Sequence, residues 1–134
     1  MSLKNSNRGG SFMGSIERLQ ELSEIEKGWL GDGQGERVVE LALLQAKELI
    51  SARADLADLF RIFPTIDGGV SLEFDIDDWS FAVEIMPDGV VEIDGGSEGG
   101  EVFEGRSFDG LSKDFFEALD EMVSGAFRDG DSAA

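Results

Sequence analysis

Residues 70–85 read VSLEFDIDDWSFAVEI and contain two runs in which apolar and polar residues alternate. Strict alternation is typical of strands that bury one face of a sheet. A hairpin with a two-residue turn, Asp77-Asp78, sets every apolar residue of one run opposite an apolar residue of the other, beginning with Ile76 and Trp79 beside the turn. A shift of one residue would expose this whole set, so the pattern predicts the register as well as the strands. Asp-Asp is not a favoured hairpin pair, which leaves a longer loop open.

Turn signals on both sides extend this hairpin into a meander. The sequence PDG at 87–89 predicts a tight turn into a further strand, and DGG at 67–69 joins the hairpin to a preceding strand at 61–66. The glycine-rich residues 95–100 predict a flexible loop before a possible short edge strand at 101–105. Because parallel strands need long crossovers, strands joined by such short turns must be antiparallel.

Helical periodicity flanks the strands at both ends of the chain. One helix is predicted to begin with Ser15 as its N-cap and to carry its apolar face to Trp29, and a second helix covers about 36–55. A third begins near Asp109 or Ser112. The predicted fold class is therefore α+β, an antiparallel four- to five-stranded meander with two N-terminal helices and one C-terminal helix packed on one face.

A single domain is expected, because 134 residues suffice for one hydrophobic core. Residues 1–14 are predicted to be a flexible tail, 15–128 to form the single α+β domain, and 129–134 to be a frayed C-terminus.

The residue types that the chain lacks narrow its chemistry. It has no His, Cys or Tyr, which excludes Ser-His-Asp catalysis, a thiol nucleophile and the usual zinc sites. We therefore expect a protein that is not an enzyme and uses no cofactor. The formal net charge of −18 disfavours nucleic acid as a partner. No stretch is apolar enough for a membrane span or a secretory signal, so we expect no membrane association and a cytoplasmic location.

Three short motifs carry a resemblance to a known group of proteins. They are GWLGDGQG at 28–35, PTIDGGVSLEF at 64–74 and VEIMPDG at 83–89. In these motifs the chain resembles a group of small bacterial proteins of unknown function, over roughly residues 24–95. Phe74 stands where the group has Trp. The resemblance implies a bacterial α+β domain and brings no catalytic residues with it.

Acidic residues dominate the part of the chain that is predicted to form the sheet. Between Arg61 and Arg106 there is no Lys or Arg but there are twelve carboxylates. On the polar face of the predicted sheet, the register sets Glu84 beside Glu92, and the row contains Glu73, Asp75, Glu84, Glu92 and Asp94. Such a row is most often a solvated face that prevents edge-to-edge aggregation, and the second interpretation is a docking surface for a basic protein.

A divalent cation site is the third interpretation of these acids. Asp75, Asp77 and Asp78 are the natural candidates, although Trp79 and Ser80 stand where the EF-hand template requires a third ligand and a glycine. The leading hypothesis is a non-catalytic acidic interaction protein that binds a basic partner, of the antitoxin-like, immunity-type or adaptor kind. The alternatives are a carboxylate-based cation-binding protein or enzyme, and an inhibitor of nucleic-acid enzymes that imitates the charge of DNA.

Four aromatic residues are candidate core or interface anchors. Trp29 and Trp79 are predicted to anchor the glycine loop and the hairpin end, and Phe116 and Phe127 lie on the apolar side of the predicted C-terminal helix. Trp is also enriched at interface hot spots. The apolar residues of the second helix extend to more than one side, which leaves a monomer and a homodimer as equal alternatives.

Overall fold

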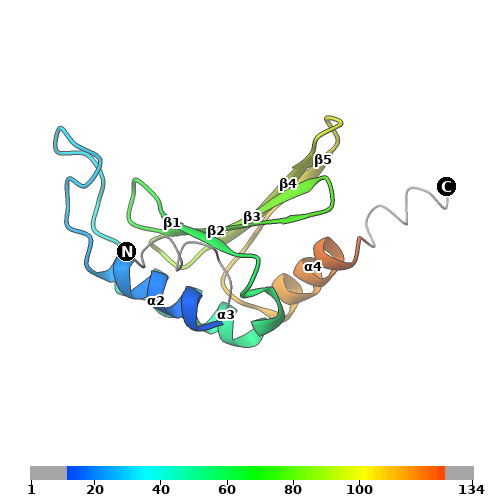
Figure 1. The fold of residues 1–134 in the computed structure, drawn as a ribbon, viewed down its shortest axis with the longest axis horizontal. Helices are drawn as coiled ribbons and strands as arrows, with labels where there is room; N and C mark the ends of the chain where they lie inside the picture. The colour runs from blue at the N-terminus through cyan, green and yellow to red at the C-terminus, as the bar shows by residue number, and fades with distance from the viewer. Residues whose placement is uncertain (1–11, 126–134) are drawn as a thin grey trace.

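The computed structural model describes residues 12–125. Its elements, labelled as in Figure 1, are α2 (Phe12–Ser23), α3 (Glu40–Ala52), the short 3₁₀ helix η1 (Ala54–Leu56), β1 (Arg61–Pro64), β2 (Val70–Ile76), β3 (Trp79–Ile85), β4 (Val91–Ser97), β5 (Val102–Phe108) and α4 (Lys113–Ser124). The predicted α+β class is confirmed.

The strands form one antiparallel sheet in the order β1-β2-β3-β4-β5, which is a simple meander. The predicted register of the β2–β3 hairpin is confirmed, since Ile76 lies opposite Trp79 and the pairing continues to the far end of both strands. The turn does consist of two residues, and Asp77 adopts a φ of 56°. Asp tolerates this left-handed conformation better than most residues.

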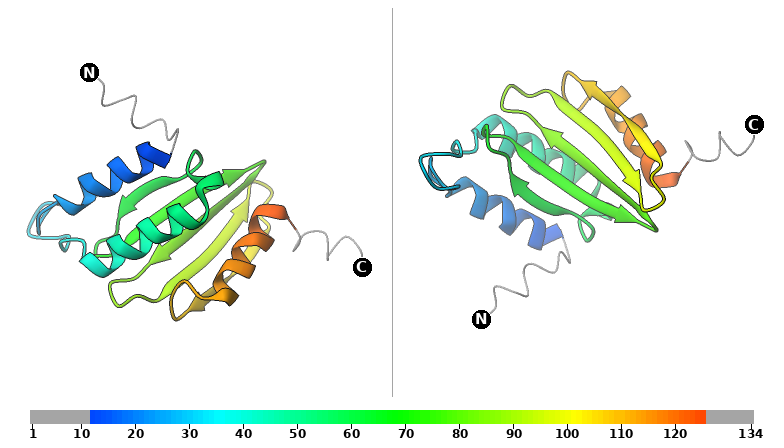
Figure 2. Two further views of the ribbon diagram at one scale, coloured as in Figure 1. Left: turned by 90° about the horizontal axis from the view of Figure 1, so that it is seen from below. Right: turned by 90° about the horizontal axis from the view of Figure 1, so that it is seen from above.

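All three helices lie on one side of the sheet, with α2 and α3 over β1 to β3 and α4 over the opposite edge (Figure 2). Most of the apolar residues of the strands point to this side and are buried, whereas Phe63 of β1 and Val102 of β5 are exposed. Aromatic rings fill the centre, where Phe74 packs against Phe60 and Phe81, and Trp79 stacks on Phe81 with ring centroids 5.7 Å apart. The largest fully buried side chains are Phe74, Phe115, Leu22, Leu49, Ile50, Leu72, Ile85, Ile93, Leu119, Met122, Val70 and Val83.

The prediction of a flexible loop at 95–100 is wrong for its first three residues, because β4 continues through Gly95 to Ser97. A Cβ atom on Gly95 would come within 2.4 Å of Cδ1 of Phe81, so glycine here makes room for a packed ring. Phe103 of β5 packs edge-on against the same ring. The edge strand is accordingly longer than the predicted 101–105.

The ends of the helices also differ from the sequence-based prediction. Residues 12–14, assigned to the tail, belong to α2, and Ser15 is not its N-cap but a buried residue that donates a hydrogen bond to the carbonyl of Ala57. The helix ends at Ser23, before Trp29.

The start of α3 is delayed because the preceding segment binds the sheet instead. The N–H of Glu36 donates to the carbonyl of Ile66, and that of Val39 to the carbonyl of Gly68, so both are committed to the β1–β2 turn. α3 accordingly spans Glu40–Ala52 rather than 36–55.

The sequence predicts that the last helix, α4, begins near Asp109 or Ser112, and the second position is confirmed. Ser112 is its N-cap and accepts a hydrogen bond from the N–H of Phe115. Phe127 and residues 129–134 lie outside the described part of the chain. Within residues 12–125, no helix combines the length and apolar character that a membrane crossing requires.

Two adjacent glycines test the packing around Phe81. We expect Gly95→Ala to lower the free energy of unfolding by about 1–3 kcal/mol, because the added methyl group displaces the ring of Phe81. In the matched control Gly96→Ala, the nearest atom to the added Cβ is the carbonyl oxygen of Glu101 at 3.5 Å, an ordinary contact. Urea denaturation of both variants measures the difference, and equal losses would contradict this account of Gly95.

Candidate binding site on the open sheet face

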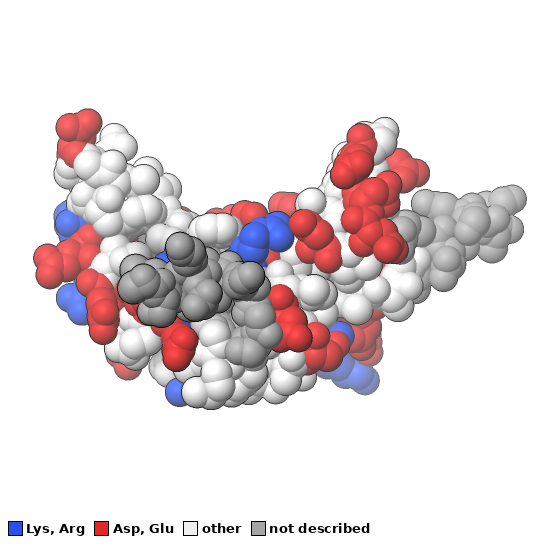
Figure 3. Space-filling model, viewed as in Figure 1, with Lys and Arg blue, Asp and Glu red and all other residues white. Residues whose placement is uncertain are grey.

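The side of the sheet that faces away from the helices is here called the open face. In Figure 2 no helix covers it, and in Figure 1 it curves upward at both ends and is therefore concave. The strand registers place on it the residues that alternate with the buried ones: the polar Ser71, Glu73, Asp75, Ser80, Glu84, Glu92 and Asp94, together with the small Ala82. All five carboxylates of the predicted partner-binding row thus lie on one surface. Figure 3 shows further Asp and Glu side chains gathered over the end of the β4–β5 hairpin.

Arg61 partly neutralises one side of this surface. It lies on β1 opposite Glu73, and its guanidinium reaches Asp75 with N–O distances of 3.2 and 3.3 Å and Glu73 at 4.0 Å. The hydrogen bond from Arg61, with a second from Ser80, lowers the pKa of the Asp75 carboxyl. The contact is exposed and adds little stability, but it provides Glu73 and Asp75 with a positive charge.

Three carboxylates on the other side of the open face form what we call the acidic triplet: Glu84, Glu92 and Asp94. Glu84 lies directly opposite Glu92, and Asp94 is opposite Ala82. The chain between 12 and 125 provides none of them with an ion pair. Glu84 is half-buried, and this burial raises its pKa, with the negative charges of Asp67, Glu92 and Asp94 acting in the same direction. Within the part of the chain that the structure describes, the triplet is therefore a concentration of negative charge without an ion-pair partner.

A shallow hollow of about 400 Å³ adjoins the triplet. Its walls combine carboxylates with apolar groups, and its lining residues are Asp67, Met86, Pro87, Asp88, Val90 and Glu92. Asp67 reaches this position because Gly69 brings the β1–β2 turn close to the end of β3, where a Cβ atom would lie 2.3 Å from the carbonyl oxygen of Ile85. An apolar wall beside a carboxylate suits the side chain of Lys or Arg, which has an aliphatic stem and a charged end.

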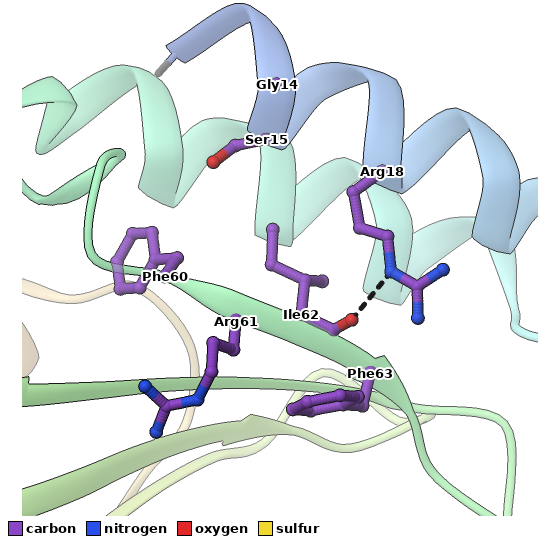
Figure 4. A pocket seen from close by; sticks show the side chains of 7 residues that line it. All are labelled: Gly14, Ser15, Arg18, Phe60, Arg61, Ile62 and Phe63. Atoms are coloured by element: carbon purple, nitrogen blue, oxygen red, sulfur yellow. Dashed lines mark hydrogen bonds between the residues drawn. The ribbon is translucent and has the colours of Figure 1, made fainter. Parts of the chain in front are cut away.

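The two edges of the sheet are poorly suited to binding a further strand. Arg18 of α2 donates from Nε to the carbonyl of Ile62 at 2.8 Å and so occupies the outer edge of β1, beside a cavity of about 290 Å³ (Figure 4). In Figure 4 the guanidinium of Arg61 points away from that of Arg18, toward the open face. At the other edge, a shift of register between Ile93 and Gly95 marks a bulge in the β4–β5 pair. Short, capped or bulged edges disfavour strand addition, so within the sheet the open face is better suited to a partner than either edge.

The three residues of the predicted cation site do not come together to form such a site. Asp75 is bound by Arg61, whereas Asp77 and Asp78 form the exposed β2–β3 turn. Over residues 12–125, no three carboxylates are placed so that they could hold a metal ion together.

The candidate anchors have different surroundings. Trp79 is buried in the core. Trp29 is half-buried, and its Nε1 donates to the carbonyl of Glu36 at 2.8 Å while its ring packs on Gly35 and so closes the glycine loop. Phe116 is half-buried against Phe115.

Sequence reasoning missed two contributors to the site, Arg61 and Asp67. Arg61 precedes the acidic stretch in sequence, and only the pairing of β1 with β2 brings it to Asp75. For Asp67 the signal was present in Gly68-Gly69, since consecutive glycines indicate a close approach of two backbone segments.

The raised pKa of Glu84 gives the stability a defined pH dependence. Because the carboxyl binds its proton more tightly in the folded state, the folded state holds more protons above the ordinary pKa of 4.5, and stability falls as the pH rises through this window. We expect Glu84→Gln to raise the melting temperature at pH 7 and to give no gain below pH 4.5, where Glu84 is already protonated. Thermal denaturation over this pH range measures the effect, with Glu101→Gln as an exposed control. A gain that persists unchanged at low pH would show that charge is not its cause.

The sequence matches no protein-family model, and no curated protein or solved structure matches it either.

Proposed function

We propose that this protein is a non-catalytic interaction protein that binds a basic protein partner through the open face of its sheet. The observation that carries the proposal is the acidic triplet, in which half-buried Glu84 faces Glu92 and no cation among residues 12–125 forms an ion pair with either. A positively charged side chain from a partner would remove the mutual repulsion and lower the pKa of Glu84. An antitoxin-like, immunity-type or adaptor role would each use such a surface.

The surroundings of the triplet favour a Lys or Arg side chain as the group that is bound. The hollow beside Glu92 offers Met86, Pro87 and Val90 to an aliphatic stem, and Asp67 and Glu92 to its charged end. The Arg61 side of the open face is compensated, so we expect the strongest contacts over β3 and β4. Phe63, exposed on the open face of β1, provides an apolar contact beyond the charged area.

A surface whose acids serve only to contact water explains the partly buried position of Glu84 less well. Carboxylates that face water fully lose little by standing opposite one another, because solvent and salt screen them. Glu84 is partly withdrawn from water among like charges, which disfavours the folded protein, and a cationic side chain from a partner would relieve this cost. The wide negative field of the chain would in addition steer a basic partner and accelerate its association.

A non-catalytic role is supported by the chemistry of the chain. The sequence lacks His, Cys and Tyr, and the described residues bring no three carboxylates together for a metal ion. The acids of the open face are spread along strands rather than gathered in an enclosed cavity. Such a surface is suited to recognition over an extended area.

The proposal is tested by removing the charge of the triplet without changing its shape. The immobilised protein should retain a basic protein from cell extract at low salt and release it at high salt. The variant Glu84→Gln, Glu92→Gln, Asp94→Asn should bind the identified partner at least about tenfold more weakly, as isothermal titration calorimetry with the purified partner measures.

A control variant separates the open face from the overall charge. It removes three negative charges, as many as the triplet variant does, from exposed positions outside the open face: Glu26→Gln, Asp58→Asn and Glu117→Gln. This control should bind the partner like the original protein. If both variants bind the partner equally weakly, the net charge of the protein alone explains the loss of affinity. If no basic protein is retained in a salt-sensitive manner, the proposed function is wrong.

A further inference from the structure

A second candidate surface lies on the opposite side of the molecule, where α2 and α3 run antiparallel over the sheet (Figure 2). A groove of about 210 Å³ separates the two helices on their outer side. Apolar side chains line its centre, and Leu44 at its rim is 57% exposed. The lining residues are Ile16, Leu19, Gln20, Ser23, Glu40, Leu43, Leu44 and Lys47.

The charges of this groove differ from those of the rest of the protein. Its lining contains one acid, Glu40, and one base, Lys47, and is thus neutral in a chain of net charge −18. Neither side chain makes an ion pair with another described residue. Both are exposed, and no other side chain of residues 12–125 neutralises them.

The spacing of these residues makes the groove self-complementary. Glu40, Leu44 and Lys47 are separated by four and three residues and lie on one side of α3. Leu44 therefore stands between an acid one turn before it and a base one turn after it. If a second α3 lies antiparallel across the first, with a two-fold axis near Leu44, each Glu40 faces a Lys47 and the two leucines meet at the centre.

We propose that the α2–α3 groove binds a second copy of this chain and forms a symmetric dimer. Leu44 of each protomer enters the groove of the other, and Glu40 pairs with Lys47 of the partner subunit. A second copy is the occupant that the charges favour, because two chains of the same strong negative charge repel each other at most other surfaces. The groove offers a neutral, apolar surface whose two charges are satisfied by its own rotated copy.

The dimer is tested first by the size of the full chain in solution. Sedimentation velocity at increasing protein concentration should show a monomer–dimer equilibrium. Leu44→Asp should abolish the dimer by placing a charge at the centre of the contact. Val102→Asp, which adds the same charge at a residue that is 75% exposed on β5, should leave it intact. Circular dichroism confirms that both variants remain folded.

Charge reversal tests the orientation of the two helices. Glu40→Lys and Lys47→Glu should each weaken the dimer about tenfold, because each sets like charges opposite each other twice in a symmetric contact. The double variant should restore the original affinity. Glu40→Lys is especially informative because it reduces the net negative charge of the chain, so general repulsion alone would predict a tighter dimer.

Three results would overturn the proposal. The first is a chain that stays monomeric up to roughly 1 mM, the weak limit of specific association. The second is a dimer that survives Leu44→Asp. The third is a double charge reversal that fails to restore what the single reversals remove, since Glu40 and Lys47 would then not face each other.

Discussion

The register of β2, β3 and β4 is the constraint on which the rest of the structure depends. Burying the large apolar residues of these strands under the helices forces the intervening residues onto the other side, where Glu84 must lie opposite Glu92. Opposed like charges cost up to about 1 kcal/mol per pair, whereas one buried Val or Ile side chain contributes about 1.5–3 kcal/mol. The core therefore decides the register, and the concentration of charge on the open face is its consequence.

The parts of the fold that follow from local alternation could be predicted from the sequence. The β2–β3 hairpin follows from the pattern, because a shift of one residue would expose Phe74 and Phe81, and a two-residue turn sets the two opposite each other. The parts that depend on distant contacts could not be predicted. Residues 36–39 have the composition of a helix start, yet their N–H groups bind the β1–β2 turn. Gly95 resembles a loop residue, yet the ring of Phe81 requires it within a strand.

The same distinction applies to the candidate site. Glu73, Asp75, Glu84, Glu92 and Asp94 could be assigned to one surface, because strand periodicity alone sorts residues between the two faces of a sheet. Their division into a compensated and an uncompensated part depends on long-range contacts. A strand pair brings Arg61 to Asp75, and a close turn brings Asp67 toward Glu84; neither is encoded in the spacing of the acids themselves.

The two proposed surfaces limit each other through charge. Two copies of the acidic face would repel each other, so the proposed self-association would use the neutral groove on the helical side. Because the helices and the open face lie on opposite sides of the sheet, a dimer formed through α3 leaves both open faces accessible and directed away from each other. A partner with two basic segments could then bind both protomers, and the second contact would form at a high effective concentration. Under the two proposals, the strong negative charge would thus attract basic partners to the sheet and restrict self-association to the helices.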